Sequence, residues 1–465
     1  MKHTPSPNSI VVTLMAIAVL LLPLVAGCQA PTPTPAPTAA PTAAPTAVVT
    51  PKPAATTPAP AATKPATPAP TSKPATPQPA AKPVSIKLGI VADQTGPTAS
   101  GNVGVFWGYQ DLAKWANDNN YVPGVTFDTI AYDNRFDMGR SLSGYELMKT
   151  RGVSVIHEQM TGANYALKDK YAADKIVAFI PPAPKALHPP GWAFTADASY
   201  SDAAAMAFEW IVQDWKSTGK PGKPKMAWLT WDADYGQAGA IANWYATDIG
   251  IEVLRNEFYA AQVPADVTSQ LLRIKDAGAD YVISMGVQTA WQIVLKDAQR
   301  LGLKDKMKFI GVGNAMESDV LINLTKEASD GVYQTTFSSS LHEENVPGVQ
   351  WLKDLMVRYH GEWQNYMVNT RNYIEMKMLM EAVKIAIQKD GIAPDKVNGQ
   401  VIYNSLEKNF KDWSTDGLTA PLTISSDNHS AARMGKILQI KGEKPLPITG
   451  WIKAPHITRF EDVKK

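Results

Sequence analysis

Cysteine is almost absent from this chain, which contains only one in 465 residues, Cys28. A single thiol cannot form a disulfide within the chain, and it leaves no pair for a cysteine metal site. Cys28 follows an apolar stretch, residues 10–25, and precedes a segment rich in proline and threonine. Everything after that point must therefore fold and work without thiol chemistry.

Acidic and aromatic residues are both missing from residues 29–83, which hold 17 of the 36 prolines. Such a segment cannot bury enough apolar surface to fold. Its prolines favour an extended chain of about 3.1 Å per residue, or on the order of 170 Å in all. The composition predicts a disordered linker over 29–83.

Residues 1–28 are typical of an export signal. Lys2 gives a positive start, and the apolar stretch is shorter than the ~20 residues that span a bilayer. The sequence Val25-Ala26-Gly27-Cys28 resembles the bacterial lipobox, in which the cysteine receives a diacylglycerol after cleavage. We predict a lipoprotein signal peptide with lipidation at Cys28. The alternative is a conventional signal peptide beside an incidental cysteine.

Net charge is low, at +2, and unevenly distributed. Residues 1–83 hold five lysines and no acidic residue, so residues 84–465 carry a net charge of −3. A mildly acidic body argues against a nucleic-acid partner, which requires a basic surface. Its 382 residues exceed the ~250–300 at which single cores stop growing, so the length predicts two lobes.

From residue 84 onward, short apolar runs alternate with amphipathic stretches, on both sides of a glycine-proline break at 219–224. Nearly continuous apolar runs are typical of strands buried on both faces of a parallel sheet. The pattern predicts an α/β fold with two Rossmann-like lobes, then helices over about 346–389 and closing strands over 422–452. The predicted strands are 86–92, 125–132, 153–157, 175–180, 225–231, 251–259, 280–286 and 308–313, and the predicted helices are 105–117, 139–150, 165–173, 203–215, 237–249, 267–277 and 289–301.

Motifs for catalysis are lacking. No GxxxxGK[ST], GxSxG or HExxH sequence occurs, and Gly311-Val312-Gly313 lacks the third glycine of a dinucleotide loop. Asp232 and Asp234 fit helix caps or cleft residues better than cation ligands. We therefore expect no enzyme activity, no metal and no cofactor, with an anchored extracellular hydrolase as the less favoured alternative.

Ligands of open parallel sheets bind beyond the carboxyl ends of the strands. Thr161-Gly162 and Gly236 each precede a helical run at that edge and could offer backbone N–H groups to a ligand. The loops expected at this edge are 92–104, 133–137, 157–164, 181–190, 232–236, 286–290 and 311–317.

The body carries several motifs in an informative order, including IKLGIVADQTGP (86–97), VSVIHEQMTG (153–162) and WLTWDADYGQ (228–237). Over residues 85–452 this order resembles the type I periplasmic solute-binding proteins of ABC transporters, in the leucine/isoleucine/valine-binding family. The resemblance implies two parallel-sheet lobes joined by three crossovers, with the ligand in the cleft between them. It implies a first lobe of about 84–198 and 337–420, and a second lobe of about 199–336 with a closing segment, 421–465.

Carried over by position, the resemblance implies that Thr161 and the backbone near Ala183 donate to a ligand carboxylate. Tyr235 would form an aromatic wall, with Gln288 in the next loop. The candidate ligand-binding residues are Gln94, Gln159, Met160, Thr161, Pro182, Ala183, Tyr235, Gln288 and Asn314.

Two positions depart from the family pattern. Pro184 replaces a carboxylate-binding threonine, and Gly313 replaces the acid that pairs with an amino group. Because a buried ammonium without a partner is costly, an amide, an aromatic acid, a peptide or another polar organic solute fits better than a branched-chain amino acid.

The resemblance implies a monomeric, extracytoplasmic solute-binding protein, lipid-anchored to a bacterial cell membrane or outer membrane. It would capture a small polar solute of amino acid, amide or aromatic acid type by hinge closure and deliver it to an ABC permease. The alternative from another class is a ligand-sensing ectodomain for a membrane signalling partner.

Overall fold

The computed structural model describes residues 83–313, 318–365 and 369–463. The chain divides into two compact units, Met1–Pro77 and Gln78–Lys465, and the described residues all belong to the second. The predicted signal peptide, Cys28, nearly all of the linker and Asn314 lie outside the described residues. Within the described ranges, no helix has both the length and the apolar character needed to cross a membrane.

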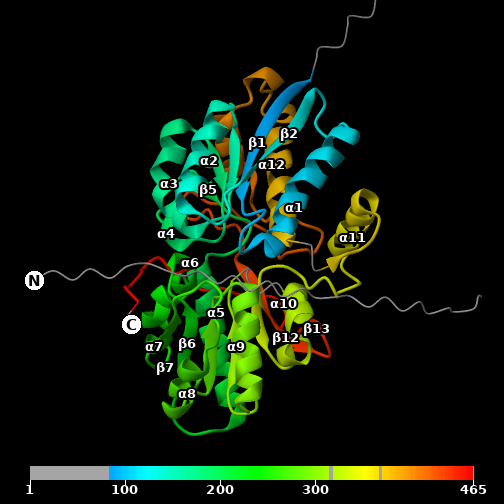
Figure 1. Ribbon diagram of the computed structural model, residues 1–465. Coiled ribbons are helices and arrows are strands. Elements are labelled where there is room, and N and C mark those ends of the chain that lie inside the picture. Colours follow the sequence, from blue (N-terminus) through cyan, green and yellow to red (C-terminus); the bar gives the residue numbers. More distant parts are fainter. Residues whose placement is uncertain (1–82, 314–317, 366–368, 464–465) are drawn as a thin grey trace, which may run out of the picture. The chain divides into compact units, whose positions relative to one another are not determined.

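The first sheet has five strands in the order β2-β1-β3-β4-β5, and all of its pairs are parallel. We call this sheet with its helices the first lobe, at the top of Figure 1. Two helices from late in the chain, α12 and α13, pack on it beside α1 and β4. Its elements are β1 (Val84–Ala92), α1 (Ala99–Asp118), β2 (Val125–Asp133), α2 (Met138–Thr150), β3 (Val155–Glu158), α3 (Thr161–Asp174), β4 (Val177–Phe179), α4 (Pro184–Leu187), β5 (Ala193–Phe194), α12 (Thr370–Gln388) and α13 (Gly399–Asn409).

The second sheet has nine strands along the path β13-β12-β11-β10-β9-β6-β7, with β8 beside β6 and β14 beside β12. The strands from β7 to β11 are parallel, and β12 and β13 close the sheet antiparallel. This sheet with its helices is the second lobe. Its elements are α5 (Tyr200–Thr218), β6 (Lys225–Trp231), α6 (Asp234–Gln237), α7 (Asn243–Asp248), β7 (Glu252–Val253), β8 (Glu257–Tyr259), α8 (Thr268–Asp276), β9 (Tyr281–Ser284), α9 (Gln288–Arg300), β10 (Lys308–Gly311), α10 (Ser318–Thr325), β11 (Tyr333–Thr336), β12 (Met434–Lys441), β13 (Lys444–Pro447) and β14 (Ile452–Lys453).

The chain passes between the two lobes three times, after β5, after β11 and after α13. The second passage leads into α11 (Pro347–His360), which contacts α1. The first and third passages run side by side, because Thr195 donates its N–H to His429 O at 3.2 Å and accepts from Ala431 N at 2.9 Å. These paired segments connect the two lobes, and the α/β fold with three crossovers is confirmed.

Apolar strands build the cores, as the near-continuous runs predict. Ile90 of β1 and Ile310 of β10 are fully buried, and so is Phe208 of α5 between them in sequence. All three belong to one apolar cluster that reaches into both lobes. Burying a side chain of this size contributes about 1.5–3 kcal/mol.

Two predicted elements are broken in the structure. The predicted strand 251–259 is two strands, because Val253 pairs with Met226 while Glu257 pairs with Leu229. An advance of three residues along β6 is therefore paired with an advance of four residues along the segment from Val253 to Glu257. The extra residue forms a β-bulge. The predicted helix 237–249 is α6, a short 3₁₀ turn and α7, and it starts earlier, at Asp234. The chain runs tightly against Trp228 at this break, where a Cβ on Gly239 would lie 2.7 Å from the Trp228 ring.

Candidate functional site

Two adjoining cavities lie at the carboxyl ends of the parallel strands. The glutamine cavity, of about 70 Å³, is lined by Gln159, Thr161, Tyr235 and Gln288 among others. The serine cavity, of about 110 Å³, is lined by the segment Ser338–Ser340 together with other polar residues. Tyr200 and Asn369 line both. Each cavity exceeds several-fold the ~10–15 Å³ that one water molecule requires.

Both lobes contribute to the glutamine cavity. Gln159 and Thr161 follow β3 in the first lobe, while Tyr235 in α6 and Gln288 at the start of α9 follow β6 and β9 in the second. The parallel topology explains this convergence, because residues after neighbouring strands meet at one edge of a sheet. A fifth candidate, Pro182, lines the serine cavity.

Three candidates do not line either cavity. Gln94 is exposed, and its backbone N–H donates to Asp133 Oδ1 at 2.8 Å. Met160 turns its sulfur toward Ser141 Oγ, 3.9 Å away. Ala183 is fully buried, and its N–H donates to Pro181 O at 2.5 Å within the same turn. A ligand role for these residues stays a prediction.

Glycines let the lobes approach each other at the cavity. A Cβ on Gly162, in the first turn of α3, would lie 2.7 Å from Asp234 Oδ2 of the second lobe. A Cβ on Gly101, in α1, would lie 3.1 Å from Gln288 Oε1. A carboxylate near a helix N-terminus is favourable, so the approach of Asp234 to α3 stabilises this contact between the lobes.

A second polar contact lies at the serine cavity, which Asp319 and Asn365 both line. Asp319 on α10 has its Oδ1 2.7 Å from His342 Nε2 and 2.8 Å from Asn365 Nδ2. Asp319 belongs to the second lobe, whereas Asn365 lies between α11 and α12. This three-residue contact, the Asp319 latch, joins α10 to the segment between α11 and α12.

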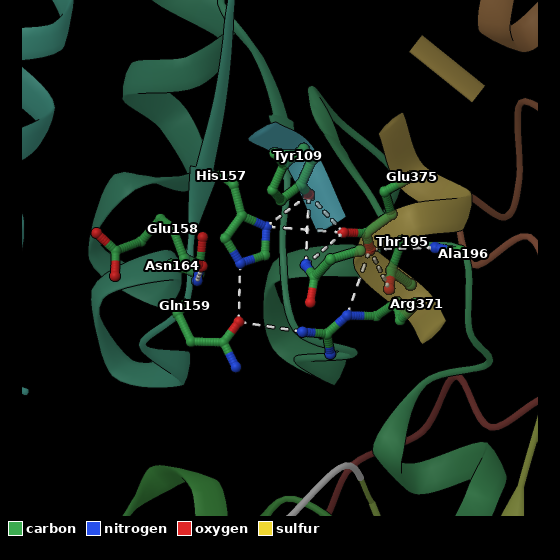
Figure 2. Close-up of polar contacts among 10 residues, drawn as sticks. Tyr109, His157, Glu158, Gln159, Asn164, Thr195, Ala196, Arg371 and Glu375 are labelled. Atoms are coloured by element: carbon green, nitrogen blue, oxygen red, sulfur yellow. Dashed lines mark hydrogen bonds and ion pairs between the residues drawn. The ribbon is translucent and has the colours of Figure 1, made fainter. Parts of the chain in front are cut away.

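A buried polar cluster stands behind the glutamine cavity, and the sequence did not indicate it (Figure 2). We call Tyr109, His157, Gln159, Arg371 and Glu375 the Arg371 cluster. Tyr109 comes from α1 and His157 from β3, while Arg371 and Glu375 lie one turn apart on α12. Arg371 Nη2 donates to Gln159 Oε1 at 3.0 Å. The one available signal was a pair of opposite charges four residues apart in α12.

Burial shifts the pKa values of several groups around the site. Burial, aided by nearby Arg371, lowers the pKa of His157 to about 3. Burial raises the pKa of Glu375 to about 7 even though Arg371 opposes the change. Burial likewise raises the pKa of Asp197 to about 6 and that of Glu158 to about 8. The loss of solvation therefore favours the neutral forms of these four side chains.

These contacts suit binding better than catalysis. Donors and acceptors converge from two lobes on a small space, with Tyr200 and Tyr235 supplying aromatic faces 5.3 Å apart. Among the described residues, no group of three or more histidine, cysteine or carboxylate side chains is placed to hold a metal ion.

A family model described as periplasmic binding protein matches residues 85–444. The chain belongs to this family. Its members are substrate-binding proteins, not enzymes, and the family implies an extracytoplasmic location. The expected family is thereby confirmed.

Solved structures of this fold align over most of the body of this periplasmic binding protein. A branched-chain amino acid ABC transporter protein from Thermus thermophilus with bound valine has a TM-score of 0.71 and 22% identity, covering 80% of this chain and 98% of that one. A fatty acid ABC transporter substrate-binding protein from Thermomonospora curvata has a TM-score of 0.68 and 18% identity, over 80% and 94%. A solute-binding protein of an ABC transporter from Rhodopseudomonas palustris BisB5, in complex with 3,4-dihydroxybenzoic acid, has a TM-score of 0.65 and 18% identity, over 80% and 98%. A search of curated proteins found no match.

Proposed function

We propose that this chain is the solute-binding protein of an ABC importer, anchored outside the cytoplasm by a lipid at Cys28. It captures a small polar organic solute by closing its lobes and presents it to a permease. The observation that carries the proposal is the glutamine cavity, where Gln159 and Thr161 of one lobe face Tyr235 and Gln288 of the other. A solute that contacts both lobes stabilises the closed form by its differential affinity.

An aromatic acid or amide is the favoured solute class. Phe136, Tyr200 and Tyr235 give the glutamine cavity aromatic surface, and Thr161 begins α3, whose first turn offers backbone donors. Gly313 has a φ of +84°, and a Cβ there would lie 3.1 Å from Met285 and Tyr200. A side chain at that position would be strained by the left-handed backbone and would require Met285 and Tyr200 to shift, which supports the expectation drawn from the sequence.

The serine cavity contains two carboxylates, Asp197 and Asp319, that could pair with a cationic group. A solute that extends into it would therefore carry hydroxyl, amide or amino groups. The solute panel accordingly includes valine as well as aromatic acids, their amides and short peptides.

The test is a thermal-shift screen of the mature protein against that panel, followed by calorimetry. A solute at 100 times its Kd should stabilise the protein by about 2.7 kcal/mol. Tyr235→Ala and Thr161→Ala should each weaken binding at least about tenfold, since each removes contacts from one lobe. Wild-type affinity in both variants would overturn the placement of the site.

The anchor is tested separately. The full chain expressed in bacteria should incorporate labelled fatty acid and sediment with membranes, and Cys28→Ala should do neither. Equal membrane recovery of both forms would contradict lipid anchoring at Cys28.

A further inference from the structure

The Gln159 amide has a defined orientation. Its Oε1 lies 3.0 Å from Arg371 Nη2 and 2.8 Å from His157 Nε2. Arginine only donates hydrogen bonds, so the atom that faces Arg371 must be the amide oxygen. The amide nitrogen of Gln159 then points away from both partners (Figure 2), and Gln159 lines the glutamine cavity.

The orientation of the Gln159 amide determines which ring nitrogen of His157 carries a hydrogen. Because Gln159 Oε1 accepts, His157 Nε2 must carry a hydrogen. The other ring nitrogen, Nδ1, lies 2.8 Å from Tyr109 Oη, which in turn lies 2.6 Å from Glu375 Oε2. The single hydroxyl proton of Tyr109 can serve only one of these two neighbours. The other hydrogen bond needs a second proton. Either His157 Nδ1 or the Glu375 carboxyl must carry it, in addition to the hydrogen on His157 Nε2.

The extra proton resides on Glu375. Burial keeps the His157 ring neutral and raises the pKa of the Glu375 carboxyl. Tyr109 then donates to His157 Nδ1 and accepts from the Glu375 carboxyl. The groups that face Glu375 are Arg371 and Asn372 on α12, Tyr109 on α1, His157 on β3, and Thr195, Ala196 and Asp197 after β5.

We infer that Gln159 is a specificity-determining residue that offers amide N–H groups to the solute, and that it selects solutes with a carboxylate or carbonyl oxygen at that position. The inference rests on the proposed function because it concerns the same cavity. Thr161 and the first turn of α3 line the same wall, and they add donors for the same oxygen.

The first experiment is calorimetry at pH 6 with 4-hydroxybenzoate, 4-hydroxybenzamide and 4-methylphenol, which lacks the acceptor. Wild type should prefer the first two. Gln159→Leu should lose about tenfold or more for both and none for 4-methylphenol. Gln159→Glu keeps acceptors for Arg371 and His157, so it should fold, and it should lose more affinity for the acid than for the amide. Gln299→Leu, the same exchange at an exposed position of α9, is the matched control. Wild-type affinities in both Gln159 variants would overturn the inference.

The second experiment needs no solute. Nitrogen-15 NMR of the ligand-free protein at pH 6 should show His157 with a hydrogen on Nε2 and none on Nδ1. A hydrogen on Nδ1 alone would overturn the inference even if solutes bind. If wild type binds none of the panel, the proposed function fails, and the His157 tautomer still decides the inference.

Discussion

The two lobes treat buried charge differently. The first lobe encloses the carboxyls of Glu158 and Glu375, both fully buried, and Glu375 pairs with a buried arginine, Arg371. In the second lobe, Glu257 pairs with Arg273, whose side chain is 55% exposed. Desolvation is severe in the first case and slight in the second. The first-lobe wall of the glutamine cavity thus stands against buried charge, whereas the second-lobe wall presents Tyr235 and Gln288.

Removing one cation from each lobe should give the largest contrast. Arg371→Met leaves the buried carboxyl of Glu375 without its cation and should lower the free energy of unfolding by about 3–5 kcal/mol. Arg273→Met, the matched change in the second lobe, should lower it by less than about 1 kcal/mol. Urea unfolding at pH 7 measures both. Equal losses in the two variants would remove the distinction between the lobes.

The pH dependence of stability should come from the first lobe. Burial raises the pKa of Glu158 to about 8 and that of Glu375 to about 7. The folded protein therefore holds protons that the unfolded chain releases above pH ~4.5. The stability that these two carboxyls contribute is full below that pH and is lost as pH rises toward 8.

Glu158→Gln should flatten this profile, because the amide does not titrate. Asp280→Asn, on the second sheet, is the control and should leave the profile unchanged. Melting temperatures between pH 5 and pH 8 decide the point, and a wild-type profile in Glu158→Gln would assign the pH dependence elsewhere.

Closure of the lobes should depend on Gly162. In Gly162→Ala the new methyl group would meet Asp234 of the opposite lobe. Such overpacking costs about 1–3 kcal/mol in the closed form alone and should weaken solute binding about tenfold. Small-angle scattering should show a more open particle. Gly191→Ala, which has nothing within 4 Å, is the control, and Asp234→Ala should restore binding in the double variant.

The Asp319 latch should have the smallest effect. Asp319→Asn removes the charge that faces His342 Nε2 at 2.7 Å, although Asn365 can still bond to the amide oxygen. The loss is about one hydrogen bond, or about 0.5–1.5 kcal/mol. It should appear as a several-fold faster release of solute in stopped-flow measurements. An unchanged release rate would exclude the latch from closure.

The sequence predicted the sheets, the crossovers and much of one cavity wall, because these follow from local pattern and motif order. Gln159, Thr161, Tyr235 and Gln288 were all found this way, each just beyond a strand. The β-bulge before Glu257 could not be predicted, since it depends on how many residues of β6 lie opposite. Arg371 was missed for a related reason. It lies more than 200 residues after Gln159 in the chain, and only the packing of α12 on the first sheet brings them together.

The central claim is that solute binds between the lobes in the glutamine cavity. A crystal structure of the protein with the tightest solute of the panel tests it most directly. We predict a solute oxygen within hydrogen-bond distance of Gln159 and Thr161, with Tyr235 of the other lobe against the same molecule. Solute bound to one lobe only, or outside this cavity, would contradict the account.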